Sequence, residues 1–101
     1  MDFDEFVRKS LKKAADTLPE FKQVSSNKTK LNGLLAQRVV FRCKWKTTYV
    51  RALMYIVFAD GRAYHITCTA TTDEYPRHES IFEDVCKTFE TFGTLDEDKA
   101  G

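Results

Sequence analysis

The sequence predicts one α+β domain, in which a four-stranded antiparallel sheet is flanked by an N-terminal and a C-terminal helix. Three observations support this prediction. Apolar residues recur every three or four positions near both ends of the chain, whereas the middle alternates with period two. The pairs Asn32-Gly33 and Asp60-Gly61 lie where tight turns would join successive strands. At 101 residues and 43% apolar content, the chain can bury one modest core.

The first predicted element is an amphipathic helix over residues 1–18. Its apolar side is formed by Phe3, Phe6, Val7, Leu11, Ala14 and Leu18. Asp2 and Glu5 have the spacing of a capping box at the helix start. Pro19 ends the helix, because the residue before a proline is forced out of helical geometry.

Two strands follow. Residues 21–31 are very polar and alternate weakly, which is typical of an exposed edge strand whose lysines discourage aggregation. Residues 34–46 alternate cleanly, so we expect one buried face and one solvated face. The predicted buried face holds Leu35, Val39, Phe41, Cys43 and Trp45, and the solvated face holds Arg38, Arg42, Lys44 and Lys46. We place the turn that ends this strand at Thr47-Thr48.

The next two strands form a hairpin. Residues 49–58 are apolar on both faces, as in a central strand, and Asp60-Gly61 closes a two-residue turn. Pairing Ala59 with Arg62 fixes the register of the hairpin. One face then mixes apolar and hydroxyl groups, and we expect it to be only partly covered: Ala52, Met54, Ile56, Phe58, Ala63, His65, Thr67 and Thr69.

The last predicted element is a second helix. Ser80 and Glu83 have capping-box spacing, which would start the helix at Ser80. Its predicted buried stripe is Phe82, Val85, Phe89 and Phe92, and Gly93 would end it. The domain therefore spans residues 1–93, and residues 94–101 form an acidic, flexible tail.

Several functional classes find no support in the sequence. The two histidines, His65 and His78, form no catalytic constellation, and no glycine-rich phosphate loop is present. Cys43, Cys68 and Cys86 are widely spaced, so we expect reduced core thiols and no metal site. No segment has the length of a membrane span or the pattern of a secretory signal. We therefore expect a soluble, cytoplasmic protein with possible access to the nucleus, without cofactors and without enzymatic activity.

Charge is segregated along the chain. Residues 20–51 carry a net charge of +7 and residues 73–99 carry −6, although the whole chain is at +1. Such polarity can steer a charged partner, or the two regions can pair with each other. We predict that the cations of one strand bind a protein partner: Arg38, Arg42, Lys44 and Lys46. Nucleic-acid binding has less support, because Phe41 and Trp45 are placed on the opposite face from these cations.

A small-ligand or lipid site is the alternative. It would use the mixed face of the hairpin, where Met54, His65, Thr67 and Thr69 combine apolar and polar groups. This hypothesis predicts a pocket between the sheet and a helix, lined by these four residues.

Three segments together resemble the PsbP/Mog-like family: "KTKLNGLLAQRVVF" (28–41), "MYIVFADGRAYHITCTATTDEY" (54–75) and "FEDVCKTFETF" (82–92). The family includes the extrinsic P protein of photosystem II, the Ran-binding Mog proteins and bacterial lipoproteins of similar shape. The matching features are the small and basic residues after "LNG", the short Asp-Gly hairpin with its Thr-Ala ending, and the closing helix.

The resemblance implies a non-enzymatic role in assembly or in binding a protein, with a small GTPase as the partner suggested by analogy. Family members begin with additional strands before the first helix, so this chain resembles a minimal or N-terminally trimmed version. The sheet would then keep an edge that is either exposed and polar or paired with a second copy in a homodimer.

Overall fold

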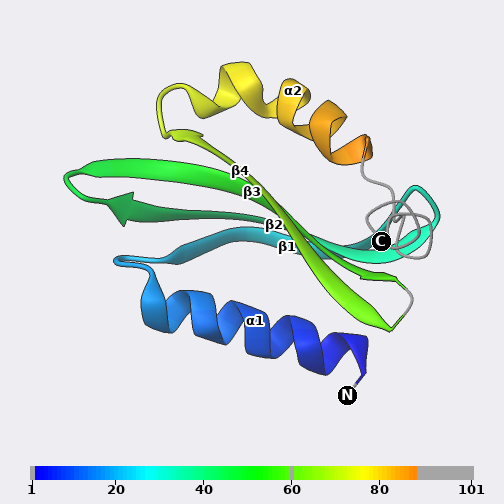
Figure 1. The fold of residues 1–101 in the computed structure, drawn as a ribbon. Helices are drawn as coiled ribbons and strands as arrows, with labels where there is room; N and C mark the ends of the chain where they lie inside the picture. The colour runs from blue at the N-terminus through cyan, green and yellow to red at the C-terminus, as the bar shows by residue number, and fades with distance from the viewer. Residues whose placement is uncertain (1, 60, 89–101) are drawn as a thin grey trace, which may run out of the picture.

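The computed structural model describes residues 2–59 and 61–88 of the chain. The elements are α1 (Phe3–Thr17), β1 (Lys22–Leu31), β2 (Leu34–Trp45), β3 (Thr48–Ala59), β4 (Arg62–Thr71) and α2 (Tyr75–Lys87). The strands form one antiparallel sheet in the order β1-β2-β3-β4. One helix lies on each face of this sheet, which gives three layers (Figure 1). The predicted α+β class and order of elements are confirmed.

The start of α1 follows the sequence signal. The Asp2 carboxylate accepts a hydrogen bond from the backbone N–H of Glu5 at 2.7 Å, which satisfies one of the free donors at the helix end. Leu18 adopts extended geometry immediately before Pro19, so the helix ends where the proline requires. Phe3 and Val7 are the residues that α1 buries against the sheet.

Tight turns set the register of the sheet. Asn32 and Gly33 have φ angles of 51° and 82°, and Gly61 has a φ of 73°, as hairpin turns of this kind require. Ala59 pairs with Arg62, so the predicted register of β3 and β4 is confirmed along its whole length. The middle turn is different, because β3 already begins at Thr48. Lys46, with a φ of 57°, lies in that turn and not within β2.

Both faces of β2 are covered at its centre, so the prediction of a fully solvated face is wrong. Val39, Phe41 and Cys43 are buried on one face, as expected, whereas Leu35, predicted on the same buried face, is 38% exposed. On the other face, Ala36 and Val40 are buried as well. These smaller apolar residues alternate with the cations and pack in the same cluster as α2, which the period-two pattern alone did not reveal.

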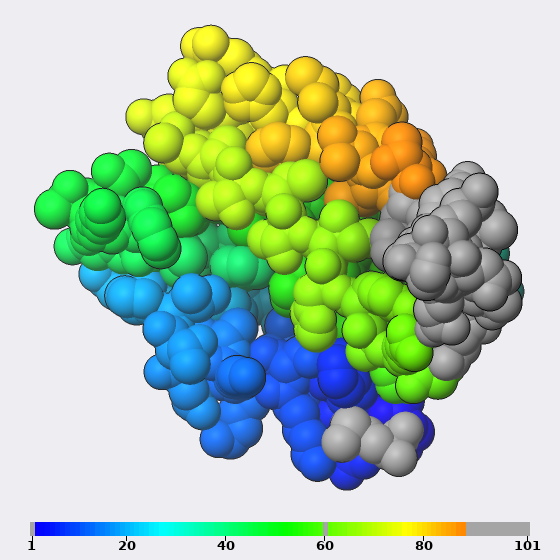
Figure 2. Space-filling model, in the orientation of Figure 1, coloured from blue at the N-terminus to red at the C-terminus, as the bar shows by residue number. Residues whose placement is uncertain are grey.

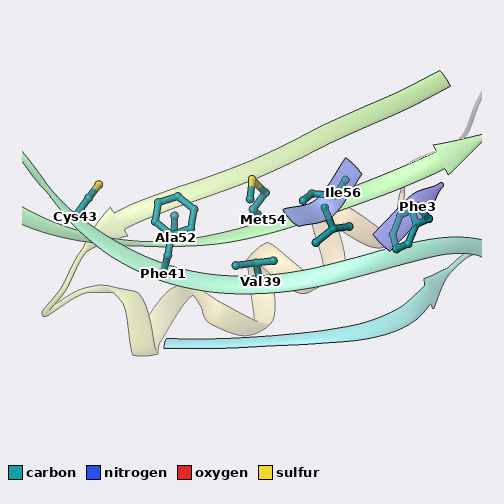
Figure 3. Close-up of a cluster of buried hydrophobic side chains, with 8 residues drawn as sticks. Phe3, Val39, Phe41, Cys43, Ala52, Met54 and Ile56 are labelled. Carbon is teal, nitrogen blue, oxygen red and sulfur yellow. The ribbon is translucent and has the colours of Figure 1, made fainter. Parts of the chain in front are cut away.

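Two apolar clusters hold the layers together. The cluster beneath α1 consists of Phe3, Val7, Val39, Phe41, Cys43, Ala52, Met54 and Ile56 (Figure 3). The cluster beneath α2 consists of Leu31, Ala36, Val40, Leu53, Tyr55, Val57, Tyr75 and Cys86. Strand β3 contributes to both clusters, which confirms its prediction as a central strand.

Helix α2 begins at Tyr75, more than one turn before the predicted start at Ser80. Pro76 lies in its first turn, where the fixed φ of proline suits a helix and its missing N–H is not needed. Ser80 is therefore inside the helix and caps nothing. The prediction failed because Tyr75 and Pro76 already start the helix, and the Glu83 carboxylate contacts the sheet instead of a backbone N–H.

The buried stripe of α2 also differs from the prediction. Val85 is 49% exposed, whereas Tyr75 and Cys86 are 2% and 0% exposed. Phe82 packs against the same cluster as predicted. The predictions for Phe89, Phe92 and Gly93, and for the tail at residues 94–101, concern positions outside the described residues. Among the described residues, no helix has the length and apolar character needed to cross a membrane.

Candidate functional site

The four cations that the sequence singled out are divided between two environments. Arg38 lies at the centre of β2, beneath α2. Its Nε and Nη2 atoms donate to Glu83 Oε2 at 2.9 and 2.6 Å, and Glu79 lies 3.7 Å away. Tyr55 donates its hydroxyl hydrogen to the other oxygen of Glu83 at 2.7 Å. Arg38 therefore belongs to a polar contact that joins β2, β3 and α2.

The Arg38–Glu83–Tyr55 contact has a defined protonation state. Burial alone would raise the pKa of Glu83, but the hydrogen bonds from Arg38 and Tyr55 outweigh it, so the pKa lies below its usual value. Burial and the adjacent carboxylate raise the pKa of Tyr55 to about 12. Glu83 is thus an anion and Tyr55 a neutral donor at neutral pH. With side chains only about a quarter exposed, this contact is part of the fold.

The other three cations lie at the far end of β2. Arg42 is exposed, and the pairing of the strands places Lys22 on one side of it and Arg51 on the other. Lys44 contacts Glu20 at 3.7 Å, and its ammonium group lies 5.5 Å from the centre of the Tyr49 ring. Lys46 is exposed in the turn that follows.

Two exposed aromatic side chains accompany these cations. Trp45 is 64% exposed and Tyr49 is 49% exposed, although the sequence analysis placed Trp45 on the buried face. The β2–β3 hairpin reaches past the end of α1, so no helix covers this part of the strand (Figure 1). In the space-filling view the hairpin forms the green projection (Figure 2). We call this set the hairpin-end surface: Arg42, Lys44, Trp45, Lys46 and Tyr49.

A hollow of about 1080 Å³ adjoins the hairpin-end surface. It shares Arg42 and Tyr49 with that surface and is also lined by Lys22, Thr72 and Asp73. The Tyr49 hydroxyl donates to Glu20 at 2.9 Å on its rim. Because the lining carries charges of both signs, it favours a polar partner surface over an apolar small molecule.

The residues of the alternative ligand site lie elsewhere. Met54 is 7% exposed and packs in the apolar cluster beneath α1, so side chains fill the space in front of it. Thr67 and Thr69 are exposed on β4. His65 Nε2 lies 3.3 Å from Ser10 Oγ on α1, and burial lowers the pKa of His65. The hollow described above contains none of these four residues.

The environments of two cysteines bear on whether their thiols could react. Cys43 and Cys86 are buried free thiols, as the sequence analysis expected. Burial raises the pKa of Cys43, and it raises that of Cys86 to about 12, which disfavours the reactive thiolate. Within residues 2–59 and 61–88, no group of three or more histidine, cysteine, aspartate or glutamate side chains could hold a metal ion.

Comparison with known proteins bears on the fold alone. No protein family model matches the chain, and no curated protein matches it. A solved structure is similar: that of PA94 from Pseudomonas aeruginosa, a protein of unknown function for which a regulatory role has been suggested. The TM-score is 0.80 at 19% identity, and the match covers 89% of this chain and 62% of PA94. This chain therefore spans less than two thirds of the length of PA94.

Proposed function

We propose that this protein is a non-enzymatic interaction module that binds an acidic protein partner through the hairpin-end surface. One observation carries the proposal. Trp45 and Tyr49 are two of the most exposed large apolar side chains among the described residues. They lie in the same short stretch of chain, residues 42–49, as the three cations of the hairpin-end surface. Tryptophan, tyrosine and arginine are the residues that most often dominate binding energy in protein interfaces.

The surroundings of the four predicted cations reduce the proposed contact surface to three of them. Arg38 is withdrawn from it, because Glu83 and Glu79 already neutralise its charge. Arg42 and Lys46 are exposed, and Lys44 is half-buried and paired with Glu20. Arg42 and Lys44 lie on the same face of the hairpin as Tyr49, whereas Trp45 lies on the other face, so the surface wraps around the hairpin end. An acidic partner would gain electrostatic attraction from these cations and apolar contact from the two rings.

The PsbP/Mog-like assignment is part of the proposal. It is supported by the order of the elements and by the three sequence segments that resemble the family. A protein-binding role in the cytoplasm, with a small GTPase as one candidate partner, is what this assignment implies. The hairpin-end surface supplies the contact for such a partner.

Crosslinking from single positions tests the proposal. A photo-reactive phenylalanine analogue placed at Trp45 should crosslink a discrete protein in the native cell. The same analogue at Ile81, which is 54% exposed on α2, is the matched control and should not crosslink that protein. Equal crosslinking from both positions, or none from Trp45, would contradict the proposal.

Single-stranded nucleic acid is a second candidate for the same surface. The observation in its favour is the proximity of Lys44 to the ring of Tyr49, since exposed aromatics beside cations form stacking platforms for bases. Binding of a labelled oligothymidylate at low salt, weakening steeply as salt rises, would support this candidate. Absence of binding at low salt would remove it.

A further inference from the structure

We propose that the free edge of β1 docks an extended acidic segment of a partner protein, which adds a fifth strand to the sheet. The inference adds a second contact to the proposed function, and it rests on that function only in taking the partner to be a protein. Addition of a strand to an exposed sheet edge is a common mode of peptide recognition, in which main-chain hydrogen bonds supply affinity.

Among the described residues, no strand pairs with the outer edge of β1. Strand β1 lies at the end of the sheet and is ten residues long (Figure 1). Most of its side chains are exposed on both faces, and only Leu31 is buried. Helix α2 packs on β3 and β4, and α1 reaches β1 through an exposed Lys28–Asp4 ion pair at 2.8 Å. Every second backbone group of an edge strand is without a strand partner, so β1 presents a row of donors and acceptors.

A β-bulge limits the usable length of the edge. The register of β1 against β2 shifts between Gln23 and Ser25, where Val24 is 46% exposed. Bulges bend and twist a strand and interrupt pairing along it. From Ser25 to Leu31 the register is continuous over seven residues, which is the length of an ordinary strand. The docked segment should therefore span these residues and stop at the bulge.

The positive charge of β1 favours an acidic segment as the strand that docks on its edge. The strand carries Lys22, Lys28 and Lys30 and no acidic residue. A second copy paired antiparallel over the same seven residues would place Lys28 opposite its own copy, and like charges directly opposite are destabilising. An acidic segment would instead lie beside Lys28 and Lys30, which flank Thr29. The charge of the strand therefore favours a partner segment over the homodimer that an exposed edge also suggests.

The opposite edge, β4, serves as an internal control. Its side chains alternate between exposed and half-buried positions. His65 of β4 contacts Ser10 and the ring of Phe6 on α1, and Cys68 and Ile66 pack in the cluster beneath α2. Helices thus contact β4 from both faces. Its only cation is Arg62, at its first position, whereas β1 carries three lysines.

Titration of the isotope-labelled protein with a defined peptide tests the inference. The probe is an eight-residue peptide that alternates glutamate and threonine, with blocked ends. We expect saturable chemical-shift changes and slowed amide exchange over Ser25–Leu31. A peptide that alternates lysine and threonine, and a glutamate peptide with two central prolines, should each bind at least about tenfold more weakly, because they lack the charge and the backbone donors respectively.

Variants separate this contact from the hairpin-end surface. Lys28→Gln combined with Lys30→Glu should weaken peptide binding about tenfold, whereas Arg42→Glu combined with Lys46→Glu should change it less than about threefold. The spectra of the variants report directly whether they fold. The inference is overturned if the wild type does not bind the glutamate peptide, if the protected amides lie on β4, or if β1 is protected by self-association without peptide. None of these results affects crosslinking from Trp45, which tests the proposed function.

Discussion

The buried contact beneath α1 is made by apolar side chains, and its polar contacts, Lys28–Asp4 and His65–Ser10, involve exposed groups. The buried contact beneath α2 instead includes an ion pair. Under α1, Phe3 and Val7 pack on Val39, Met54 and Ile56. Under α2, the Arg38–Glu83–Tyr55 contact lies among apolar groups. Arg51 Nε is also buried there without a hydrogen-bond partner among the described residues, and burial together with the Glu79 carboxylate raises the pKa of Tyr75 to about 12.

The comparison of the two faces shows that charged side chains have different roles in different parts of the protein. Beneath α2 the cation Arg38 fixes the position of a helix, and its charge is neutralised within the fold. At the hairpin end the cations Arg42 and Lys46 have no ion pair within residues 2–59 and 61–88, and the proposed function assigns them to a partner. The predictions that follow test this division, from the largest expected effect on stability to the smallest.

The apolar face should respond most strongly to truncation. Ile56 is fully buried in the cluster beneath α1. Ile56→Ala should lower the free energy of unfolding by about 2–5 kcal/mol, because it removes buried methyl groups and leaves a cavity. Urea denaturation followed by circular dichroism measures the loss. A loss below about 1 kcal/mol would mean that α1 is not packed on the sheet as described.

The ion-paired face should respond less strongly. Glu83→Gln keeps the shape of the side chain but leaves Arg38 with only the more distant carboxylate of Glu79. We expect a loss of about 1–3 kcal/mol, discounted from the value for a fully buried pair because both side chains are partly exposed. The matched control is Glu79→Gln, since Glu79 lies farther from Arg38 and is 46% exposed. The control should change stability by less than about 0.5 kcal/mol, and equal losses in both variants would contradict the account.

Acid should weaken the α2 face selectively. The pKa of Glu83 is lower in the folded protein than its usual 4.5, so the unfolded chain binds the proton more tightly. The stabilisation from Glu83 is therefore complete above about pH 4.5 and is lost as the pH falls toward the folded pKa. His65, whose pKa is also lowered, acts in the same direction near pH 6.5 but is largely exposed.

The wild type should consequently lose stability below pH 4.5 more steeply than Glu83→Gln, in which no carboxylate is present at this position. Urea midpoints measured at a series of pH values test the difference. Parallel pH profiles for the two proteins would show that the carboxylate of Glu83 contributes nothing to holding α2.

The hairpin end should be the least sensitive region. Trp45 is 64% exposed and contributes to neither apolar cluster. Trp45→Ser should therefore change the free energy of unfolding by less than about 0.5 kcal/mol, as is usual for exposed positions. The urea midpoint measures this. A loss of about 2 kcal/mol or more would mean that Trp45 belongs to the fold and is not kept for a partner.

The sequence was sufficient for the features that depend on local signals. Asp2 and Pro19 mark the ends of α1, and Asp60-Gly61 fixes the register of β3 and β4, because each acts within a few residues. The partner of Arg38 could not be predicted in this way. Glu83 lies 45 positions away, and the same glutamate imitated a capping box with Ser80.

The exposure of Trp45 is a second example. Its position in the alternating pattern is identical to that of Val39, Phe41 and Cys43, which are buried. Only the end of α1 distinguishes them, since Trp45 lies beyond the reach of the helix. Period-two alternation predicts which side chains share a face, whereas the length of the covering helix decides how far along that face burial extends.

Affinity for the crosslinked partner, measured with two matched double variants, tests the central claim most directly. Trp45→Ser with Lys46→Glu alters the hairpin-end surface, and Ile81→Ser with Arg77→Glu makes the same kinds of change on the exposed side of α2. We predict that the first pair weakens binding at least about tenfold and that the second changes it less than about twofold. Equal affinity of the hairpin-end variant and the wild type would contradict the claim.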